Sequence, residues 1–293
     1  MKVVDAFGTA RDEATGVVGL VPTMGYLHEG HLSLVAAARE RSDTVVMSLF
    51  VNPLQFEDPD DLDRYPRDLE RDLALADSAG VDVVFAPTAD VMYPDPMLTS
   101  VRVGSISDRM EGAHRPGHFE GVATVVTKLL AGLRPDIACF GRKDAQQLAL
   151  VTRLASDLSF PVEIVGVPIL RHADGLALSS RNVRLRGDQR EAARGLSRGL
   201  FSAADLAAGG ERSADVLVET ATTVATTAGV TVEYAELATV DDAAPITRLD
   251  RPSFLAVAGR VGAVRLIDNV FLWPDGTADR GVTLSGPSVL EGG

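Results

Sequence analysis

Two histidines, His28 and His31, stand three residues apart directly after an apolar, β-branched run. At the start of a helix this spacing places both imidazoles on one side, where each can donate a hydrogen bond to a phosphate oxygen. The unpaired backbone N–H groups and the dipole at a helix start also favour an anion. Gly25 and Gly30 let the backbone approach a ligand without a Cβ in the way. The motif therefore predicts a phosphate-binding turn.

Two other interpretations of the histidine pair compete with this one. A zinc site of the type His-Glu-x-x-His needs the second histidine four residues after the first, and Leu32 stands at that position. The spacing excludes that zinc geometry. A chance pair of surface histidines fits poorly, because two of the five histidines bracket a glycine at a strand-to-helix turn.

Lysine is rare in this chain, and one of its three lysines, Lys143, lies between a strand-like run and a helical pattern. A compact ammonium group at that position can reach a phosphate. The neighbouring Asp144 is well placed to cap the helix, which is its purely structural interpretation. Gln146 and Gln147 either form hydrogen bonds with a polar substrate or are ordinary surface residues. The segment predicts a second anion-binding turn.

A third segment, residues 175–182, lies where the pattern of the chain changes, and it contains Ser179, Ser180 and Arg181 in succession. Two hydroxyls followed by a guanidinium suit the terminal phosphates of a nucleotide, and a junction between domains suits a loop that closes. Taken alone, the tripeptide is also compatible with a helix cap. The two phosphate-binding turns before it favour the nucleotide interpretation.

Two patterns that imitate catalytic motifs are rejected. Residues 195–199 match the Gly-x-Ser-x-Gly pattern of hydrolases, but they lie inside an amphipathic helical stretch with no strand before it. His172, Asp174 and Ser179 are close in sequence, which says nothing about the geometry of a triad. The sequence has neither a Walker lysine loop nor a dinucleotide glycine fingerprint, so a nucleotide must be held in another way.

The elements that must position these motifs alternate over the first 170 residues. Strands are predicted at residues 17–21, 44–51, 81–86, 137–140 and 162–167, and helices at 32–41, 69–79, 122–133 and 146–158. Strands that are apolar throughout and separated by helices pair in parallel, with both faces of the sheet covered. The prediction is an α/β fold with a doubly wound parallel sheet, whose ligand site lies beyond the carboxyl ends of the strands.

The pattern changes after residue 170. Alanine-rich helices are predicted at 187–208 and 213–228, and strands without intervening helices at 230–237, 253–258 and 263–271. This order indicates a smaller α+β domain. We therefore expect a first domain over residues 1–170, a second over 171–274, and a mobile tail over 275–293, which is rich in Gly, Ser and Pro.

Composition and charge exclude several classes of protein. The chain has 293 residues, of which 46% are hydrophobic and 24% charged, and its formal net charge is −13. Such a negative field repels nucleic-acid phosphates and anionic lipid, so neither nucleic acid nor a membrane is expected as a partner.

A single cysteine, Cys139, excludes an internal disulfide. With no signal peptide and no apolar run of about 18 residues, a soluble cytoplasmic protein is expected. The acidic run 57–61 is interpreted as a solvated loop.

The motifs resemble those of a known family. Residues 28–31 are similar to the His-x-Gly-His signature of the nucleotidylyltransferase superfamily, and residues 178–181 to its phosphate-binding loop. More specific motifs resemble the pantoate–β-alanine ligase (pantothenate synthetase) family, and they lie at residues 21–25, 50–56, 115–119, 141–147 and 265–269. The resemblance implies a Rossmann-like first domain that binds nucleotide and pantoate.

An ATP-dependent ligase is the activity that this resemblance implies. In the family, the carboxylate of pantoate attacks the α-phosphorus of Mg-ATP, which gives pantoyl adenylate and pyrophosphate, and the amine of β-alanine then displaces AMP. Pantoate, β-alanine, ATP and Mg²⁺ are therefore the expected small-molecule partners, and a homodimer is the expected assembly. The resemblance names no protein ligand for the metal.

The resemblance also assigns site residues. His28 and His31 contact the phosphates, with His31 as a proton donor, and Lys143 completes the catalytic set. The residues expected around ATP are Met24, Gly25, His28, His31, Gly141, Lys143, Asp144, Leu170, Leu178, Ser179, Ser180 and Arg181. The residues expected around pantoate and β-alanine are Gln55, Gln147, Asn52, Tyr65, Arg115 and His118.

Two positions depart from the family pattern. Where the family usually has Gly-Glu-Lys-Asp-(aromatic)-Gln-Gln, this chain has Arg142 and Ala145. The reversed charge beside Lys143 bears on nucleotide affinity, and the lost ring bears on packing under the helix. Two alternatives to a ligase stay open. One is a nucleotidylyltransferase that transfers AMP or CMP to a phosphorylated acceptor, and the other, suggested by these departures, is a nucleotide-binding regulatory module without catalysis.

Overall fold

The structure is a computed structural model that describes residues 1–56, 59–94 and 97–290. The chain divides into two compact units. Unit 1 comprises Met1–Leu27, His31–Gly141 and Gln147–Val167, and unit 2 comprises His28–Gly30, Arg142–Gln146 and the chain from Pro168 on. Residues 57–58 of the acidic run and 291–293 of the predicted tail lie outside the described residues.

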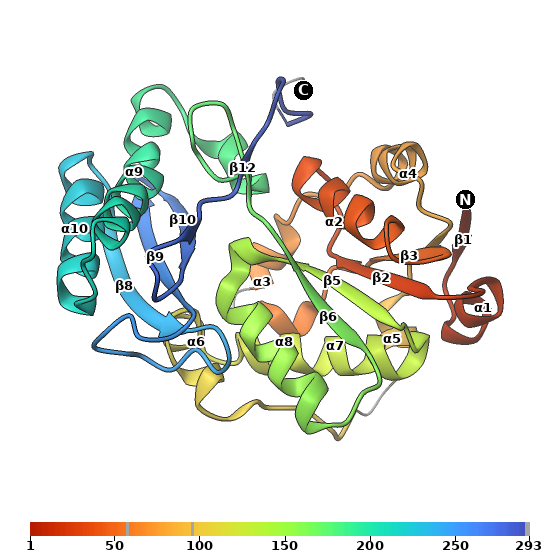
Figure 1. Cartoon of the computed structure of the whole chain (residues 1–293). Coiled ribbons are helices and arrows are strands. Elements are labelled where there is room, and N and C mark those ends of the chain that lie inside the picture. The colour runs from red at the N-terminus through yellow and green to blue at the C-terminus, as the bar shows by residue number, and fades with distance from the viewer. Residues whose placement is uncertain (57–58, 95–96, 291–293) are drawn as a thin grey trace. The chain divides into compact units, whose positions relative to one another are not determined.

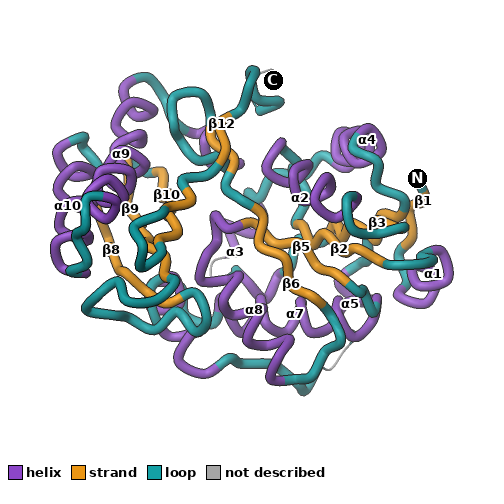
Figure 2. The backbone as a smooth tube through the Cα atoms, in the orientation of Figure 1, coloured by secondary structure: helices purple, strands orange, loops and turns teal. Residues whose placement is uncertain are grey.

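Unit 1 is built on a six-stranded sheet in the order β1-β4-β3-β2-β5-β6, whose neighbouring strands run parallel. The strands are β1 (Lys2–Val4), β2 (Val18–Thr23), β3 (Thr44–Leu49), β4 (Val83–Phe85), β5 (Ile137–Gly141) and β6 (Glu163–Val167). The predicted doubly wound parallel sheet is confirmed, and Figure 2 draws its strands in orange. The strand order reverses between β2 and β5, and α/β sheets bind ligands beside such a switch point.

Helices cover both faces of this sheet, with α2 and α4 over one face and α7 and α8 over the other (Figure 1). Leu34, Val35 and Ala38 of α2 are buried at helical spacing in one core cluster with Val21 and Met47 of the sheet. The helices are α1 (Phe7–Glu13), α2 (Glu29–Arg39), α3 (Pro59–Asp63), α4 (Leu69–Ser78), α5 (Ala89–Met92), α6 (Glu111–His114), α7 (His118–Leu133) and α8 (Ala145–Asp157). Short 3-10 turns are η1 (Pro53–Gln55), η2 (Gly104–Asp108) and η3 (Arg142–Asp144).

Unit 2 contains the predicted α+β arrangement, in which two helices pack on an antiparallel sheet ordered β11-β10-β9-β8. Its elements are β7 (Leu170–Arg171), η4 (Ser180–Arg184), α9 (Asp188–Ala208), α10 (Ala214–Thr227), β8 (Thr231–Thr239), β9 (Ser253–Val261), β10 (Val264–Leu272), β11 (Ala278–Asp279) and β12 (Val282–Thr283). Among the described residues, no helix combines the length and the apolar content that crossing a bilayer requires.

The hydrolase-like pattern at residues 195–199 is a helix-packing feature. It lies inside α9, where a Cβ on Gly199 would stand 2.4 Å from the Ala221 carbonyl oxygen of α10. Gly195 is similarly close to Ala228. The two glycines therefore let α9 and α10 approach each other, and the predicted helical placement of this pattern is confirmed.

The segment after β10 forms two short strands. β11 pairs with the end of β10, and β12 pairs in parallel with β7. Residues 278–279 and 282–283 of the predicted mobile tail lie in these two strands. The edges of β10 and β7 offer backbone hydrogen-bonding groups with which this segment pairs. Its content of Gly, Ser and Pro does not reveal that such strand edges are nearby.

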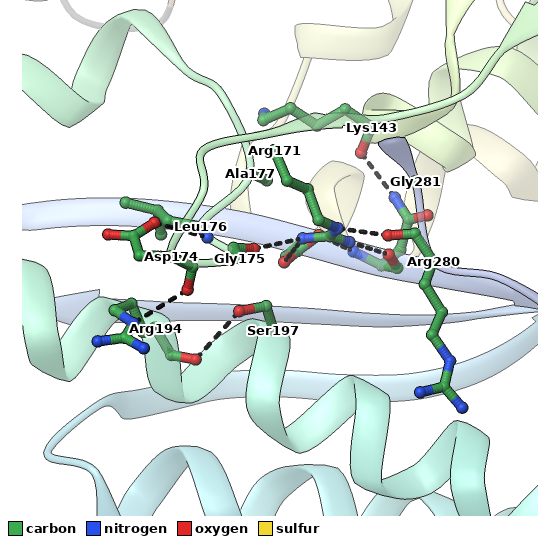
Figure 3. Close-up of polar contacts among 12 residues, drawn as sticks. Lys143, Arg171, Asp174, Gly175, Leu176, Ala177, Arg194, Ser197, Arg280 and Gly281 are labelled. Carbon is green, nitrogen blue, oxygen red and sulfur yellow. Dashed lines mark hydrogen bonds and ion pairs between the residues drawn. The ribbon is translucent and has the colours of Figure 1, made fainter. Parts of the chain in front are cut away.

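A buried arginine, Arg171, organises the polar contacts of unit 2 (Figure 3). Its side chain and that of Asp268 are each 2% exposed, and they form a bidentate ion pair with N–O distances of 2.7 and 2.9 Å. The remaining guanidinium N–H groups donate to the backbone oxygens of Gly175, Asn269 and Arg280. All five N–H donors of the guanidinium therefore have acceptors.

Substituting Asp268→Ala should destabilise unit 2 strongly, because it leaves the Arg171 cation buried without its counter-charge. We expect the free energy of unfolding to fall by about 3–5 kcal/mol in denaturant titrations. Asp250→Ala is the matched control, since Asp250 forms an exposed pair with Arg251 and should unfold like the wild type. Equal stability of the two variants would show that the buried pair is not a major support of this unit.

Candidate active site

The turn between β2 and α2 is fixed by a buried carboxylate. Asp72 of α4 is 3% exposed, and its two oxygens accept hydrogen bonds of 2.7 Å from the backbone N–H groups of Tyr26 and Leu27. Gly25 has a φ of +79°, and a Cβ there would lie 2.8 Å from the Asp72 carboxylate. Only glycine fits this turn without strain, which gives Gly25 a structural reason independent of any ligand.

Asp72 was not among the predicted site residues, although the sequence carried a signal for it. It stands four residues before Ala76, so both side chains lie on the buried face of α4. An acidic residue on the apolar face of a helix needs a partner. The partner is a distant backbone turn, which local patterns do not reveal.

His28 is held in one orientation at the start of α2. The backbone N–H of Gly30 donates to His28 Nδ1 at 3.1 Å, in the manner of a helix cap. Because Nδ1 accepts this bond, the neutral imidazole carries its proton on Nε2. A Cβ on Gly30 would lie 2.7 Å from His28 Cε1, so this arrangement requires glycine. His31, in unit 1, lies in the first turn of α2 and is partly buried.

The turn that carries Lys143 is anchored by Asn269 of β10, within unit 2. The Asn269 amide is 2% exposed, and its Nδ2 donates to the backbone oxygens of Arg142 and Lys143 at 2.9 and 2.7 Å. The Lys143 ammonium lies 4.0 Å from an Asp144 carboxylate oxygen, at the limit of an ion pair. Asp144 itself ends the 3-10 turn η3 directly before α8.

The predicted phosphate loop of unit 2 is joined to β7 by backbone bonds. The N–H of Leu178 donates to the Leu170 carbonyl at 2.9 Å. The Ser179 hydroxyl accepts from the Arg181 N–H at 3.2 Å and caps η4. The cap interpretation of the Ser-Ser-Arg tripeptide is therefore correct for Ser179. Ser180 and Arg181 are partly buried in the first turn of η4.

Asp174, in the same loop, stays ionised through its neighbours. Burial works to raise the pKa of this carboxyl, but the Leu176 N–H and the Arg190 guanidinium outweigh burial and lower it. The Arg194 guanidinium binds the Asp174 carbonyl oxygen at 3.0 Å (Figure 3). These contacts hold the base of the loop on α9.

A buried amide cluster follows β3 in unit 1. Asn52 is 1% exposed, and its Nδ2 donates to Gln55 Oε1 at 2.8 Å and to the Gly121 carbonyl at 3.0 Å. Its Oδ1 accepts from the Tyr93 hydroxyl at 2.7 Å and from the Leu54 N–H at 3.3 Å. Burial raises the pKa of the Tyr93 phenol, which keeps this donor protonated. The Asn52 amide is thus fully used within the protein, and it orients Gln55.

Arg115 and His118 meet the same residue from the start of α7. His118 Nδ1 donates to the Gln55 carbonyl at 3.0 Å, since a carbonyl oxygen only accepts. His118 Nε2 therefore serves as an acceptor for Arg115 Nη1 at 3.3 Å, and Arg115 Nη2 also binds the Gln55 carbonyl at 3.2 Å. The Arg115 guanidinium is thus held by the backbone carbonyl of Gln55 and by the His118 ring.

The structure brings part of the predicted unit 1 set to one edge of the sheet. β2, β3 and β5 are neighbours, so the residues that follow their carboxyl ends share that edge. These residues are Met24 and Gly25 after β2, Asn52 and Gln55 after β3, and Gly141 at the end of β5. Gln147 is partly buried in the first turn of α8, and Tyr65 packs on Phe56 with ring centroids 5.6 Å apart.

The lone cysteine does not belong to this chemistry. Cys139 lies in β5 and is fully buried. Burial raises the pKa of its thiol to about 11, so it stays protonated at neutral pH. A thiolate nucleophile at this position is excluded.

Gly121→Ala tests how the amide cluster is positioned. A Cβ at this position would lie 2.2 Å from the Leu54 carbonyl oxygen, so η1 or α7 must shift. We expect a loss of about 1–3 kcal/mol in the free energy of unfolding, together with faster hydrogen exchange at residues 52–55. Gly8→Ala is the control, because nothing lies within 4 Å of its added Cβ. If both variants behaved alike, the close contact between α7 and η1 would be wrong.

Comparisons with known proteins agree with this geometry. A family model described as pantoate–β-alanine ligase matches residues 2–271. The pantothenate synthetase of Corynebacterium efficiens is 54% identical over 267 residues, covering 88% of this chain and 92% of the relative. The pantothenate synthetase of Thermoanaerobacter sp. strain X514 is 50% identical over 257 residues, covering 87% of this chain and 90% of the relative.

Solved structures give the same result. Pantothenate synthetase from Thermus thermophilus matches with a TM-score of 0.87 and 45% identity, over 92% of this chain and 98% of that one. The ligase from Francisella tularensis, solved with beta-gamma ATP and β-alanine, matches with a TM-score of 0.75 and 33% identity, over 92% and 97%. Sequence and fold agree over most of the molecule, and the chain belongs to the pantoate–β-alanine ligase family.

Proposed function

We propose that this chain joins pantoate to β-alanine at the expense of ATP. In the first step, a pantoate carboxylate oxygen bonds to the α-phosphorus as the bond from that phosphorus to the bridging oxygen breaks, which releases pyrophosphate. In the second, the amine of β-alanine bonds to the acyl carbon, AMP leaves with the former carboxylate oxygen, and the nitrogen loses a proton. Adenylation makes the carboxylate oxygen a good leaving group, so no protein nucleophile is needed.

The observation that carries this proposal is the family match over residues 2–271, which spans both units. The ligase from Francisella tularensis adds chemical support, because its structure holds a nucleotide together with β-alanine. The physical requirement of the first step is to bring two anions together. Preorganised donors and cations supply that stabilisation.

We assign the ATP phosphates to donors at the ends of two strands and to the loop after β7. His28 suits this role, because its Nδ1 bond to Gly30 places the proton of the neutral imidazole on Nε2. Lys143 supplies three further donors on a turn anchored by Asn269. His31, as proton donor, and the backbone from Met24 to Gly25 complete the set on the β2 side. Residues proposed around the remainder of the nucleotide are Gly141, Asp144, Leu170, Leu178, Ser179, Ser180 and Arg181.

The anionic acid substrate is assigned to the amide cluster of unit 1. Gln55 Oε1 accepts from Asn52, which fixes the side-chain amide, and we assign its Nε2 donor to a carboxylate or hydroxyl oxygen of the substrate. Arg115 adds the positive charge that a carboxylate needs. Asn52 and His118 support these two groups through the contacts described above. Gln147 and Tyr65 stay in the proposal as further binding residues.

Magnesium enters the proposal with the nucleotide. Mg²⁺ in nucleotide enzymes is usually bound by substrate phosphates and one or two carboxylates, and it neutralises phosphate charge there. Among the residues that the structure describes, no three or more His, Cys, Asp or Glu side chains form a group that could hold a metal ion. A homodimer and a cytoplasmic location are proposed from the family resemblance alone.

An omission experiment tests the function. Purified protein should release AMP only when ATP, Mg²⁺, pantoate and β-alanine are all present, because pyrophosphate leaves in the first step and AMP only in the second. Without β-alanine, exchange of labelled pyrophosphate into ATP should still require pantoate. Exchange that depends on a phosphorylated acceptor instead would identify a nucleotidylyltransferase, and ATP binding without any exchange would identify a regulatory module.

Lys143→Ala should lower kcat/KM about 30- to 1000-fold, since one preorganised cation at the phosphates is lost. This factor corresponds to a loss of about 2–4 kcal/mol in transition-state stabilisation. Thermal unfolding should be unchanged, because the ion pair of this side chain with Asp144 lies at the distance limit. Lys2→Ala is the control, as Lys2 forms an exposed pair with Glu13. Wild-type turnover by the Lys143 variant would remove this residue from the proposed phosphate site.

A further inference from the structure

Residues 278–290, called the C-terminal segment below, follow the part of the chain that the family model matches. The segment is tied to unit 2 by backbone bonds. The Val282 N–H donates to the Ile169 carbonyl at 2.7 Å, and the Leu284 N–H donates to the Arg171 carbonyl at 2.8 Å. Gly281 makes this approach possible, since a Cβ there would lie 2.4 Å from the Ile169 carbonyl oxygen.

The segment neutralises the cation beside Lys143. Asp279 Oδ2 forms an ion pair of 2.5 Å with Arg142 Nη1, and the two side chains are only 20% and 29% exposed. The Arg142 guanidinium also lies 5.1 Å from the centroid of the Phe271 ring. Arg142 is therefore held on two sides, and its neighbour Lys143 lies on the turn that Asn269 anchors.

A second contact binds the acid beside His28. The Ser288 hydroxyl donates to Glu29 Oε2 at 2.8 Å, and the Val289 N–H donates to Glu29 Oε1. Ser288 is 4% exposed, and its contact with Glu29 is partly buried. Both oxygens of the Glu29 carboxylate thus receive a donor from the C-terminal segment.

These two contacts act on charges that a triphosphate would sense. A carboxylate next to His28 repels phosphate, and a second cation next to Lys143 offers phosphate a competing position. The ion pair with Asp279 offsets the charge of Arg142, and the two hydrogen bonds fix the position of the Glu29 carboxylate. We infer that the C-terminal segment is a positioning element for the nucleotide site, acting through Arg142 and Glu29. The inference rests on the proposed function, in which His28 and Lys143 bind ATP phosphates.

Asp279→Ala, Arg142→Ala and the double variant test the first contact. We expect the KM for ATP to rise about 3- to 10-fold in Asp279→Ala, which leaves the Arg142 cation uncompensated, and to stay near the wild-type value in Arg142→Ala, which removes that cation. The double variant should behave like Arg142→Ala, because the charge that Asp279 compensates is then absent. Asp279→Glu, which keeps the charge, should recover most of the affinity.

Asp275→Ala is the matched control for the first contact. Asp275 precedes the segment and binds Thr277 of its own turn, so its loss should leave the KM for ATP at the wild-type value. An Asp279→Ala variant that matches this control, or a double variant that keeps the loss seen in Asp279→Ala, would overturn the positioning role of the ion pair.

Ser288→Ala tests the second contact against Ser285→Ala, whose side chain is exposed. The Ser288→Ala variant should bind ATP about 2- to 5-fold more weakly, since it lacks one donor to Glu29 and keeps the Val289 N–H. Ser288→Thr, which keeps a hydroxyl, should restore affinity. Equal ATP affinity in all three variants would contradict a role for this contact.

Direct titration with ATP by calorimetry separates the inference from the proposed function. If wild-type protein binds ATP but releases no AMP with both substrates, the ligase function fails, and the ratio of ATP affinities between variant and wild type still tests the segment. If wild-type protein is an active ligase and the variants bind ATP like the wild type, the segment has no positioning role and the function stands.

Discussion

The Arg171 guanidinium is the constraint on which the rest of unit 2 depends. Burying a cation is costly unless each donor finds an acceptor, and here the five acceptors come from β10, the β7 loop and the C-terminal segment. A change in any one of these three elements would leave part of the guanidinium unsatisfied. The bidentate pair with Asp268 fixes the orientation of the Arg171 guanidinium as well as its distance from the carboxylate. The three elements are therefore coupled.

One strand serves both loops of the proposed phosphate site. Asp268 and Asn269 are consecutive in β10, and side chains of consecutive residues in a strand point to opposite faces. The first residue holds Arg171 at the start of the loop that carries Ser179, and the second holds the carbonyls of Arg142 and Lys143. Both loops are thus placed relative to the same rigid strand, which suits a site that must bind a flexible triphosphate.

Sequence periodicity predicted the elements but not the contacts that lock them. The parallel sheet and the turns after β2 and β5 follow from apolar runs and glycines, which are local signals. Asp72 and Asn269 lie far in sequence from the turns they anchor, so no spacing reveals them. The pairing of β12 with β7 is equally remote. Asn52 was predicted to bind substrate, and the structure gives its amide four contacts within the protein.

The net charge of the chain is −13, but the charges around the proposed nucleotide site are set by individual pairs of side chains. Arg142 departs from the family pattern, yet its charge is compensated by Asp279, and Ala145 is a buried residue of α8. The reversed charge beside Lys143 and the lost ring at position 145 together suggested a module without catalysis. The ion pair answers the first departure, because the charge of Arg142 is matched by Asp279. The departure at position 142 thus carries its own counter-charge within unit 2, and the proposed phosphate site assigns to this turn the cation of Lys143.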